Sequence, residues 1–327
     1  MNSNRAFTFN DIVLVPDYSE IEHGDVDIKT DWFGITVRLP VLSSPMDTIS
    51  GIKMLRAFSD FGCRGIHHRY CGMEDLRNAI WFGDIAVSPS MGIDTILSVL
   101  PSEVILVMDV AHGHTKRNIE FAKELVDAGY NVVSGNIVTP HAMYHYAKIG
   151  VKHFRVGIGS GSVCTTRMVT GVGYPQASAI QELYNEIKDN QVDYKLISDG
   201  GHKTTGDIIK ALVLGADFVM LGGMLAGTDE SAGKYTYKGT DETRTYFSYR
   251  GMASEKALST RKQDFFVEGI SKDVEAKGSV KHVLKNIENA IETACYYLGV
   301  RNLKELKEVS YQLVTESSYA EGLPYWK

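Results

Sequence analysis

Short apolar segments of strand length recur along this chain, and each is followed by a turn and then by a stretch with helical spacing. This alternation is typical of repeated β-strand and α-helix units, which build parallel sheets. The eight predicted strands cover residues 41–44, 64–67, 85–88, 104–109, 131–135, 153–156, 195–199 and 217–221. Between them, stretches such as 115–128 and 205–214 repeat apolar residues at three- and four-residue intervals, which predicts one buried stripe per helix.

Eight such units within 327 residues predict an α/β fold of the (β/α)8 TIM-barrel type, in one domain over residues 1–327. A doubly wound open sheet also uses these repeats, but the chain lacks an opening GxGxxG motif. The repeat stops after the eighth strand. Residues from about 228 to 280 have a polar sequence with tyrosine and glycine, which predicts a long irregular insertion that acts as a mobile flap. A last helix is predicted over 281–298.

Composition excludes several classes of protein. The net charge of −6 comes from mixed acidic and basic residues, so the chain has no basic face for nucleic acid. No stretch approaches 18 apolar residues and the start has no secretory pattern, which predicts a cytoplasmic protein without membrane contact. The four cysteines have irregular spacing and no CxxC pair, so they predict neither a disulfide framework nor a zinc site.

Polar residues and glycines gather where the predicted strands end. In a (β/α)8 barrel the carboxyl ends of all eight strands form one face, and active sites are built there. The sequence therefore predicts a composite site on that face. The residues at strand ends are Asp47, His67, His68, Asp109, Gly157, Asp199 and Gly222.

The loop over residues 157–173, GIGSGSVCTTRMVTGVG, directly follows the sixth strand. Its glycines let backbone amides and carbonyls approach a ligand closely. Cys164 lies in this loop beside hydroxyls of Ser162, Thr165 and Thr166, and a thiol in that setting can act as a thiolate nucleophile. A buried structural cysteine is the alternative interpretation. That structural role is the prediction for Cys63, Cys71 and Cys295.

Two glycine pairs, Gly200–Gly201 and Gly222–Gly223, follow the seventh and eighth strands. Loops at these places commonly hold a phosphate through free amides, so a phosphorylated ligand is predicted. Asp199, just before the first pair, can accept from ribose hydroxyls or can cap the next helix. Glu255 in RGMASEKAL fits a helix-capping or solvated carboxylate.

At this point the sequence resembles the IMP dehydrogenase and GMP reductase superfamily, in segments that run nearly end to end. They include FNDIVLVPDYSEI, LSSPMDTIS, GIGSGSVCTTRMVTGVGYPQ, SDGGHKTTGDIIKALVLGADFVMLGGMLAG and YRGMASEKAL. The resemblance implies a purine nucleoside monophosphate as substrate, with Cys164 as the nucleophile at purine C2 and Asp199 at the ribose. It also implies the following further sites: Ser162, Gly200, Gly201, Gly222 and Gly223 at the 5′-phosphate, Arg250, Met252 and Ser254 at the substrate, Asp109 and Ala111 at the cofactor, and carbonyls of Gly159, Gly161 and Cys164 at a monovalent cation, K⁺.

Within the superfamily, four features are similar to the reductase: IHHRY at 66–70, DVAHG at 109–113, Tyr174 and Glu255. The dehydrogenase hydrolyses its intermediate with an Arg-Tyr pair of the flap, and TRKQDFFVEG at 260–269 has none. The resemblance therefore implies an NADPH-dependent GMP reductase, active on GMP or dGMP, that forms IMP and ammonia through a Cys164 thioimidate. Thr166 and Glu255 would relay protons, and the enzyme would be a homotetramer.

Three residues depart from the reductase pattern. Ser160 replaces a proline, His68 replaces a lysine, and Arg250 is similar to the dehydrogenase. Two alternatives therefore stay open: an NAD-dependent IMP dehydrogenase, and a catalytically silent protein that binds purine nucleotides.

Overall fold

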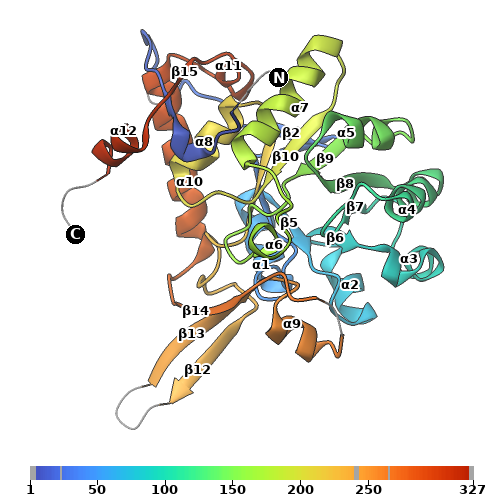
Figure 1. Cartoon of the computed structure of the whole chain (residues 1–327). Helices are drawn as coiled ribbons and strands as arrows, with labels where there is room; N and C mark the ends of the chain where they lie inside the picture. The colour runs from blue at the N-terminus through green and yellow to red at the C-terminus, as the bar shows by residue number, and fades with distance from the viewer. Residues whose placement is uncertain (1–4, 23, 239–242, 264–265, 324–327) are drawn as a thin grey trace.

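A computed structural model describes residues 5–22, 24–238, 243–263 and 266–323 of the chain (Figure 1). Eight parallel strands close into a barrel in which each strand pairs with the next in sequence, and the last pairs with the first. These strands are β4 (Val41–Ser43), β5 (Arg64–His67), β6 (Gly83–Val87), β7 (Ile105–Met108), β8 (Asn131–Ile137), β9 (His153–Val156), β10 (Lys195–Asp199) and β11 (Phe218–Leu221). All eight overlap the predicted segments, so the (β/α)8 prediction is confirmed.

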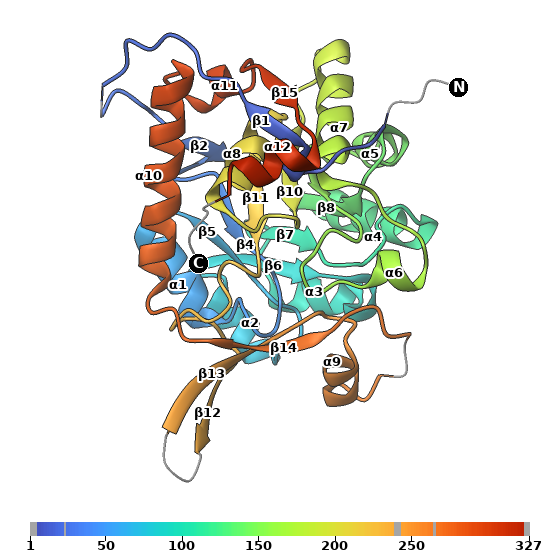
Figure 2. The ribbon, with the colours of Figure 1, turned by 60° about the vertical axis from the view of Figure 1, so that its left-hand side comes forward.

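Helices alternate with the barrel strands and surround them (Figures 1 and 2). Those between the strands are α1 (Ile52–Phe61), α2 (Met73–Ala79), α3 (Ile93–Val99), α4 (Lys116–Asp127), α5 (Pro140–Ala147), α6 (Thr166–Val169), α7 (Gln176–Asn190) and α8 (Thr205–Val213). After the barrel come α9 (Glu255–Thr260), α10 (Val280–Leu298), α11 (Leu303–Leu306) and α12 (Glu316–Glu321). None of the described helices is long and apolar enough to cross a membrane.

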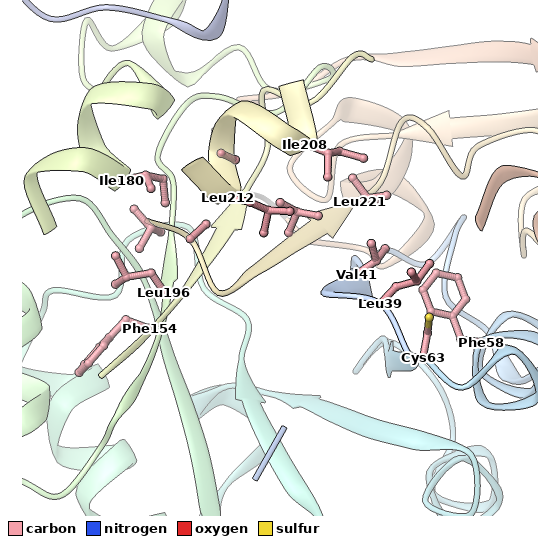
Figure 3. Packing of buried hydrophobic residues seen from close by; sticks show 14 of the residues in the cluster. Leu39, Val41, Phe58, Cys63, Phe154, Ile180, Leu196, Ile208, Leu212 and Leu221 are labelled. Carbon is pink, nitrogen blue, oxygen red and sulfur yellow. The ribbon is translucent and has the colours of Figure 1, made fainter. Parts of the chain in front are cut away.

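The main hydrophobic core lies between the strands and the surrounding helices. Figure 3 shows Leu196 of β10 and Leu221 of β11 facing Ile180 of α7 and Leu212 of α8. All four side chains are almost fully buried. Burial of an aliphatic side chain of this size contributes about 1.5–3 kcal/mol, so this layer stabilises the barrel and holds the strand ends in place.

A two-stranded hairpin, β2 (Thr30–Trp32) and β3 (Ile35–Val37), closes the amino-terminal end of the barrel. Trp32 is fully buried there and packs edge-on against Phe218, with ring centroids 4.8 Å apart. The Trp32 Nε1 donates to Asp84 Oδ2 at 2.8 Å, and Arg64 Nη2 lies 2.5 Å from Asp84 Oδ1. The sequence did not predict this closure, which leaves the carboxyl ends of the strands as the open face.

We expect Asp84→Asn to lower the free energy of unfolding by about 3–5 kcal/mol, because it leaves the partly buried Arg64 guanidinium without its ionised partner. Asp84 is fully buried, whereas Asp94 on α3 is exposed. The matched control Asp94→Asn should change stability by no more than about 0.5 kcal/mol. Urea unfolding of both variants measures the difference, and equal stabilities would contradict the role given to Asp84.

The segment after β11 differs from the prediction of an irregular insertion. It contains an antiparallel sheet of β12 (Lys234–Lys238), β13 (Thr243–Arg250) and β14 (Ser271–Glu275), with α9 between β13 and β14. The β12–β13 hairpin projects away from the barrel (Figures 1 and 2). Separately, β1 (Ile12–Leu14) pairs antiparallel with β15 (Tyr311–Leu313), so a segment near the start of the chain lies beside a segment near its end.

Candidate active site

A cavity of about 790 Å3 lies at the carboxyl ends of the barrel strands. Every barrel strand, or the turn that follows it, contributes to its wall. In strand order these residues are Ser44, Arg69, Ser88, Asp109, Asn136, Gly157, Asp199 and Gly222. Of the residues that the sequence places at strand ends, Asp109, Gly157, Asp199 and Gly222 line this cavity, whereas Asp47, His67 and His68 do not.

The 157–173 loop carries Cys164 into this cavity. Gly157, the first residue of the loop, has φ +148°, and a Cβ there would lie 2.2 Å from the Asp199 carbonyl oxygen. Only glycine allows this close approach of β9 and β10 at their carboxyl ends. The Cys164 amide donates to the Gly161 carbonyl at 3.0 Å, which turns the half-buried thiol toward the cavity wall.

Cys164 is linked through Thr166 to a carboxylate. The Cys164 Sγ lies 3.1 Å from Thr166 Oγ1, and the Thr166 hydroxyl donates to Glu268 Oε2 at 2.6 Å. Thiol, hydroxyl and carboxylate therefore form one chain of hydrogen-bonding groups. Such a chain can move a proton to or from a group that reacts at the sulfur.

Main-chain contacts fix this chain of groups. The Thr165 amide donates to the Glu268 carbonyl at 2.8 Å, and the Ile270 amide donates to the Val163 carbonyl at 3.0 Å. A Cβ on Gly251 would lie 2.8 Å from the Val163 carbonyl oxygen, so the backbones pack directly against each other. The loop that carries the thiol and the segment that carries the carboxylate are thus joined as one backbone unit.

The carboxylate at Thr166 is Glu268, and this corrects the prediction that Glu255 would pair with it. Glu255 is exposed at the first position of α9 and does not line the cavity. Because α9 begins there, Ser254 turns its hydroxyl to the helix and accepts from the Ala257 amide at 3.4 Å. Ser254 is therefore a helix cap away from the cavity wall, and the capping role comes from Ser254 rather than Glu255.

Arg250 also lies outside the cavity wall, contrary to its predicted contact with the substrate. Its guanidinium holds the Asp47 carboxylate through two contacts, 2.7 Å from Nη2 and 3.2 Å from Nε. Two parallel hydrogen bonds of this kind fix the orientation of the guanidinium relative to the carboxylate, so the pair holds β13 against the turn after β4. Met252 does line the cavity.

The residues predicted to hold a phosphate lie together. Ser162, Gly200, Gly201, Gly222 and Gly223 all line the cavity. A Cβ on Gly223 would lie 3.0 Å from Ser162 Oγ, and the backbone at Gly200 and Gly201 has positive φ. One hydroxyl and two glycine turns therefore surround the same space.

Tyr249 completes this group, and the sequence did not predict it. Its hydroxyl lies 3.0 Å from Ser162 Oγ, and only 3% of the residue is exposed. Burial raises the pKa of Tyr249, which keeps the hydroxyl protonated and able to donate. Alternating aromatic residues in TRTYFSYR were the available signal for a strand with one buried face.

Asp199 and Asp109 are held by a buried arginine that the sequence also did not predict. Arg155 Nε lies 2.7 Å from Asp199 Oδ2, and its Nη1 lies 3.3 Å from Asp109 Oδ1. Asn136 Nδ2 donates to the same Asp199 oxygen at 2.8 Å. The cap of α8 is Thr204, so the helix-capping alternative for Asp199 is wrong.

Tyr70 also lines the cavity, and its ring lies close to two guanidinium groups. Arg261 is 3.9 Å and Arg69 is 4.1 Å from the centre of its ring, and the Arg69 Nη2 donates to its hydroxyl. Burial is the largest influence on Tyr70 and raises its pKa despite both cations. The phenol therefore stays protonated at neutral pH.

The chain is similar to two kinds of enzyme at comparable identity. It is 32% identical to GMP reductase 2 of Homo sapiens over 91% of both chains. It is 30% identical to inosine-5′-monophosphate dehydrogenase of Cryptosporidium parvum over 98% of this chain and 95% of that protein. The family model described as "IMP dehydrogenase / GMP reductase domain" matches residues 6–81 and 93–325.

The chain belongs to the IMP dehydrogenase / GMP reductase family. The resemblance inferred from the sequence is thereby confirmed, and with it an oxidoreductase family that acts on purine nucleotides. Cys164 and its surrounding loop lie inside the matched region. Relatives with either name match to a similar degree, so similarity alone does not separate the two activities.

Proposed function

We propose that this chain is a GMP reductase, which uses NADPH to convert GMP or dGMP into IMP and ammonia. The observation that carries the proposal is the chain from Cys164 through Thr166 to Glu268 at the cavity wall. The 2-amino group of guanine leaves readily only when it is protonated, so the reaction needs an acid next to the nucleophile. Glu268 takes the role that the sequence analysis gave to Glu255.

In this mechanism the Cys164 thiol passes its proton to the Thr166–Glu268 pair, and the thiolate adds to C2 of the purine. The pair returns a proton to the amino group, the C–N bond breaks, and C2 remains bound to sulfur as a thioimidate. A reduced nicotinamide supplies the hydride for this carbon. The C–S bond then breaks and the Cys164 thiolate is regenerated. Overall, GMP, NADPH and two protons give IMP, ammonium and NADP⁺.

The cavity offers matching groups for the nucleotide. Ser162 and the glycine pairs Gly200–Gly201 and Gly222–Gly223 provide a hydroxyl and free backbone for the 5′-phosphate. Asp199, held by Arg155 and Asn136, presents a carboxylate to the ribose. Met252 supplies an apolar surface for the base.

The remaining wall fits a nicotinamide cofactor. Asp109 and the exposed Ala111 line the cavity, and Arg117 brings positive charge to the same wall for a cofactor phosphate. The K⁺ site stays a prediction on the carbonyls of Gly159, Gly161 and Cys164. The Gly161 carbonyl already accepts from the Cys164 amide, which leaves one lone pair for a cation.

One observation favours IMP dehydrogenase as a second candidate. Although the flap sequence has no adjacent Arg-Tyr pair, Arg261 of the flap stacks on Tyr70, which brings the same two groups together. A tyrosine that activates water must lose its proton easily, but burial raises the pKa of Tyr70. This direction disfavours a base role for Tyr70, and the assay below separates the two activities.

The His68 ring does not replace the lysine charge of the reductase pattern. Burial lowers the pKa of His68 to about 4, so its ring is neutral at pH 7. Arg69 and Arg261 line the cavity and bring positive charge to it, with Arg69 paired to Asp109 at 3.1 Å.

One assay separates the proposals. We expect NADPH absorbance to fall when the protein is mixed with GMP or dGMP, and we expect no reduction of NAD⁺ with IMP. NAD⁺ reduction with formation of XMP would assign the dehydrogenase instead. Thermal stabilisation by these nucleotides without turnover of any nucleotide and cofactor pair would assign a silent binding protein. The homotetramer is part of the proposal, and sedimentation tests it.

A further inference from the structure

Four of the ten histidines of the chain meet outside the active-site cavity. His112 and His114 lie in the loop between β7 and α4, whereas His141 and His145 lie on α5. The two on α5 are four residues apart, so their side chains share one face of the helix. Across the gap, His114 Nε2 faces His145 Nδ1 at 2.9 Å.

The spacing of three of these rings is close to that of ligands around one ion. The ring centroids of His114, His141 and His145 are 5.1, 5.0 and 4.3 Å apart, and the ring planes differ by 58–88°. With a metal–nitrogen bond of about 2.1 Å and a ring centre about 1.2 Å beyond it, rings around a tetrahedral ion have centres about 5.4 Å apart. The observed separations are smaller by a few tenths of an ångström to about 1 Å, so the rings must spread slightly to admit an ion.

His114 and His145 already face each other through ring nitrogens, as two ligands of one ion do. Two imidazole nitrogens that face each other at 2.9 Å share one N–H proton, and a metal ion must displace that proton to bind both of them. A tetrahedral ion needs the two nitrogens about 3.4 Å apart, which is a widening of about 0.5 Å. A small rotation of either partly exposed ring supplies it.

Contacts within the chain fix the loop against α5. The Tyr146 hydroxyl donates to the Gly113 carbonyl at 2.6 Å, and the Gly113 amide donates to the Asn136 carbonyl at 2.9 Å. On the other side, Asn118 Nδ2 donates to the His112 carbonyl at 2.9 Å. A backbone held from three directions places His114 opposite the helix at little cost in entropy when a ligand binds.

We propose that His114, His141 and His145 form a binding site for a divalent transition metal, with Zn²⁺ as the ion that fits best and His112 near enough to supply a fourth ligand. Imidazole is a preferred ligand of Zn²⁺, and three histidines with one further position make a common coordination set. The ion ties the β7–α4 loop to α5, and the start of that loop, Asp109 to Ala111, lines the active-site cavity.

A competing cluster exists at His67, His68 and Cys71, whose ligand atoms lie within 4.8 Å of one another. The rings of His67 and His68 stack with only 23° between their planes, so their in-plane lone pairs do not converge. The Cys71 thiol and His67 Nδ1 both contact the His68 carbonyl, at 3.3 and 2.8 Å. His68 Nδ1 is buried there without a hydrogen-bond partner, so this cluster is a rival metal site and the experiment must separate the two.

The test is a Zn²⁺ titration of the metal-free protein by calorimetry, on the wild type and four variants. We expect one ion per chain for the wild type. His141→Ala and His145→Ala should each raise the Kd by more than about a hundredfold, since even loss of an outer-shell partner costs about 10–100-fold. The controls are His282→Ala, which removes an exposed histidine on α10, and Cys71→Ser, which disables the competing cluster; both should bind as the wild type does.

Thermal unfolding supplies a second readout that does not depend on activity. Zn²⁺ should raise the Tm of the wild type and of both controls, and this rise should disappear in His141→Ala and His145→Ala. Without metal, the Tm of these two variants should stay near the wild-type value, because His141 is exposed and His145 is half-buried. Unchanged affinity in the two α5 variants, loss of binding in Cys71→Ser alone, or no stoichiometric Zn²⁺ binding by the wild type would each overturn the proposal.

Discussion

Replacement of Cys164 by alanine is expected to lower kcat by at least about a thousandfold in the reductase assay. The sulfur forms the bond to C2 in the proposed mechanism, and loss of a nucleophile has effects of this size or larger. The nucleotide should still bind, because its phosphate contacts come from Ser162 and the glycine pairs. Steady-state kinetics measure kcat, and protection against thermal unfolding by GMP measures binding.

Cys295→Ala is the matched control for the nucleophile. Cys295 is fully buried in α10, and burial raises the pKa of its thiol to about 11, so it is inert at neutral pH. Its variant should keep the wild-type kcat. A Cys164→Ala enzyme with full turnover would contradict the covalent mechanism.

Glu268→Gln is expected to lower kcat by about 10²–10⁴-fold, because the amide cannot supply a proton to the departing amino group through Thr166. The side chain keeps its size and can still accept from the Thr166 hydroxyl, so the structure of the site should persist. The measurement is kcat over a range of pH. The change of kcat with pH that the Glu268 carboxyl causes in the wild type should be absent from the variant.

Glu255→Gln provides the comparison that decides between the two carboxylates. Glu255 is exposed on α9 and makes no part of the cavity wall, so its variant should keep kcat within about twofold. If Glu255→Gln lost activity and Glu268→Gln did not, the relay proposed from the structure would be wrong and the prediction from the sequence would stand.

The barrel was predictable because its strands are buried on both faces and therefore read as continuous apolar runs, as in ILVM of β7 and FVML of β11. The β2–β3 hairpin that closes the barrel was not predictable. Its strands are three residues each, and the role of Trp32 depends on Asp84, 52 residues away in the sequence. Short segments that gain stability only from distant partners leave no periodic signal.

In the site, too, some residues were predictable from the sequence and others were not. Residues that follow strands, such as Asp199 and Gly222, were predictable because chain topology alone brings strand ends together. Glu268 was not, because it reaches Thr166 from 102 positions away through pairing of the flap with the active-site loop. Arg155 stands inside a buried strand, where a charge is rare unless it is paired, and its two aspartate partners come from other strands.

The backbone pairing of residues 163–165 with 268–270 has a kinetic consequence. Contacts within the chain itself align sulfur, hydroxyl and carboxylate, so the arriving substrate does not have to assemble them. Reactions in such preorganised sites proceed without rearrangement of dipoles at the moment of bond formation. The first turnover after rapid mixing should therefore show no lag, and its rate should be independent of how long the enzyme was kept with nucleotide beforehand.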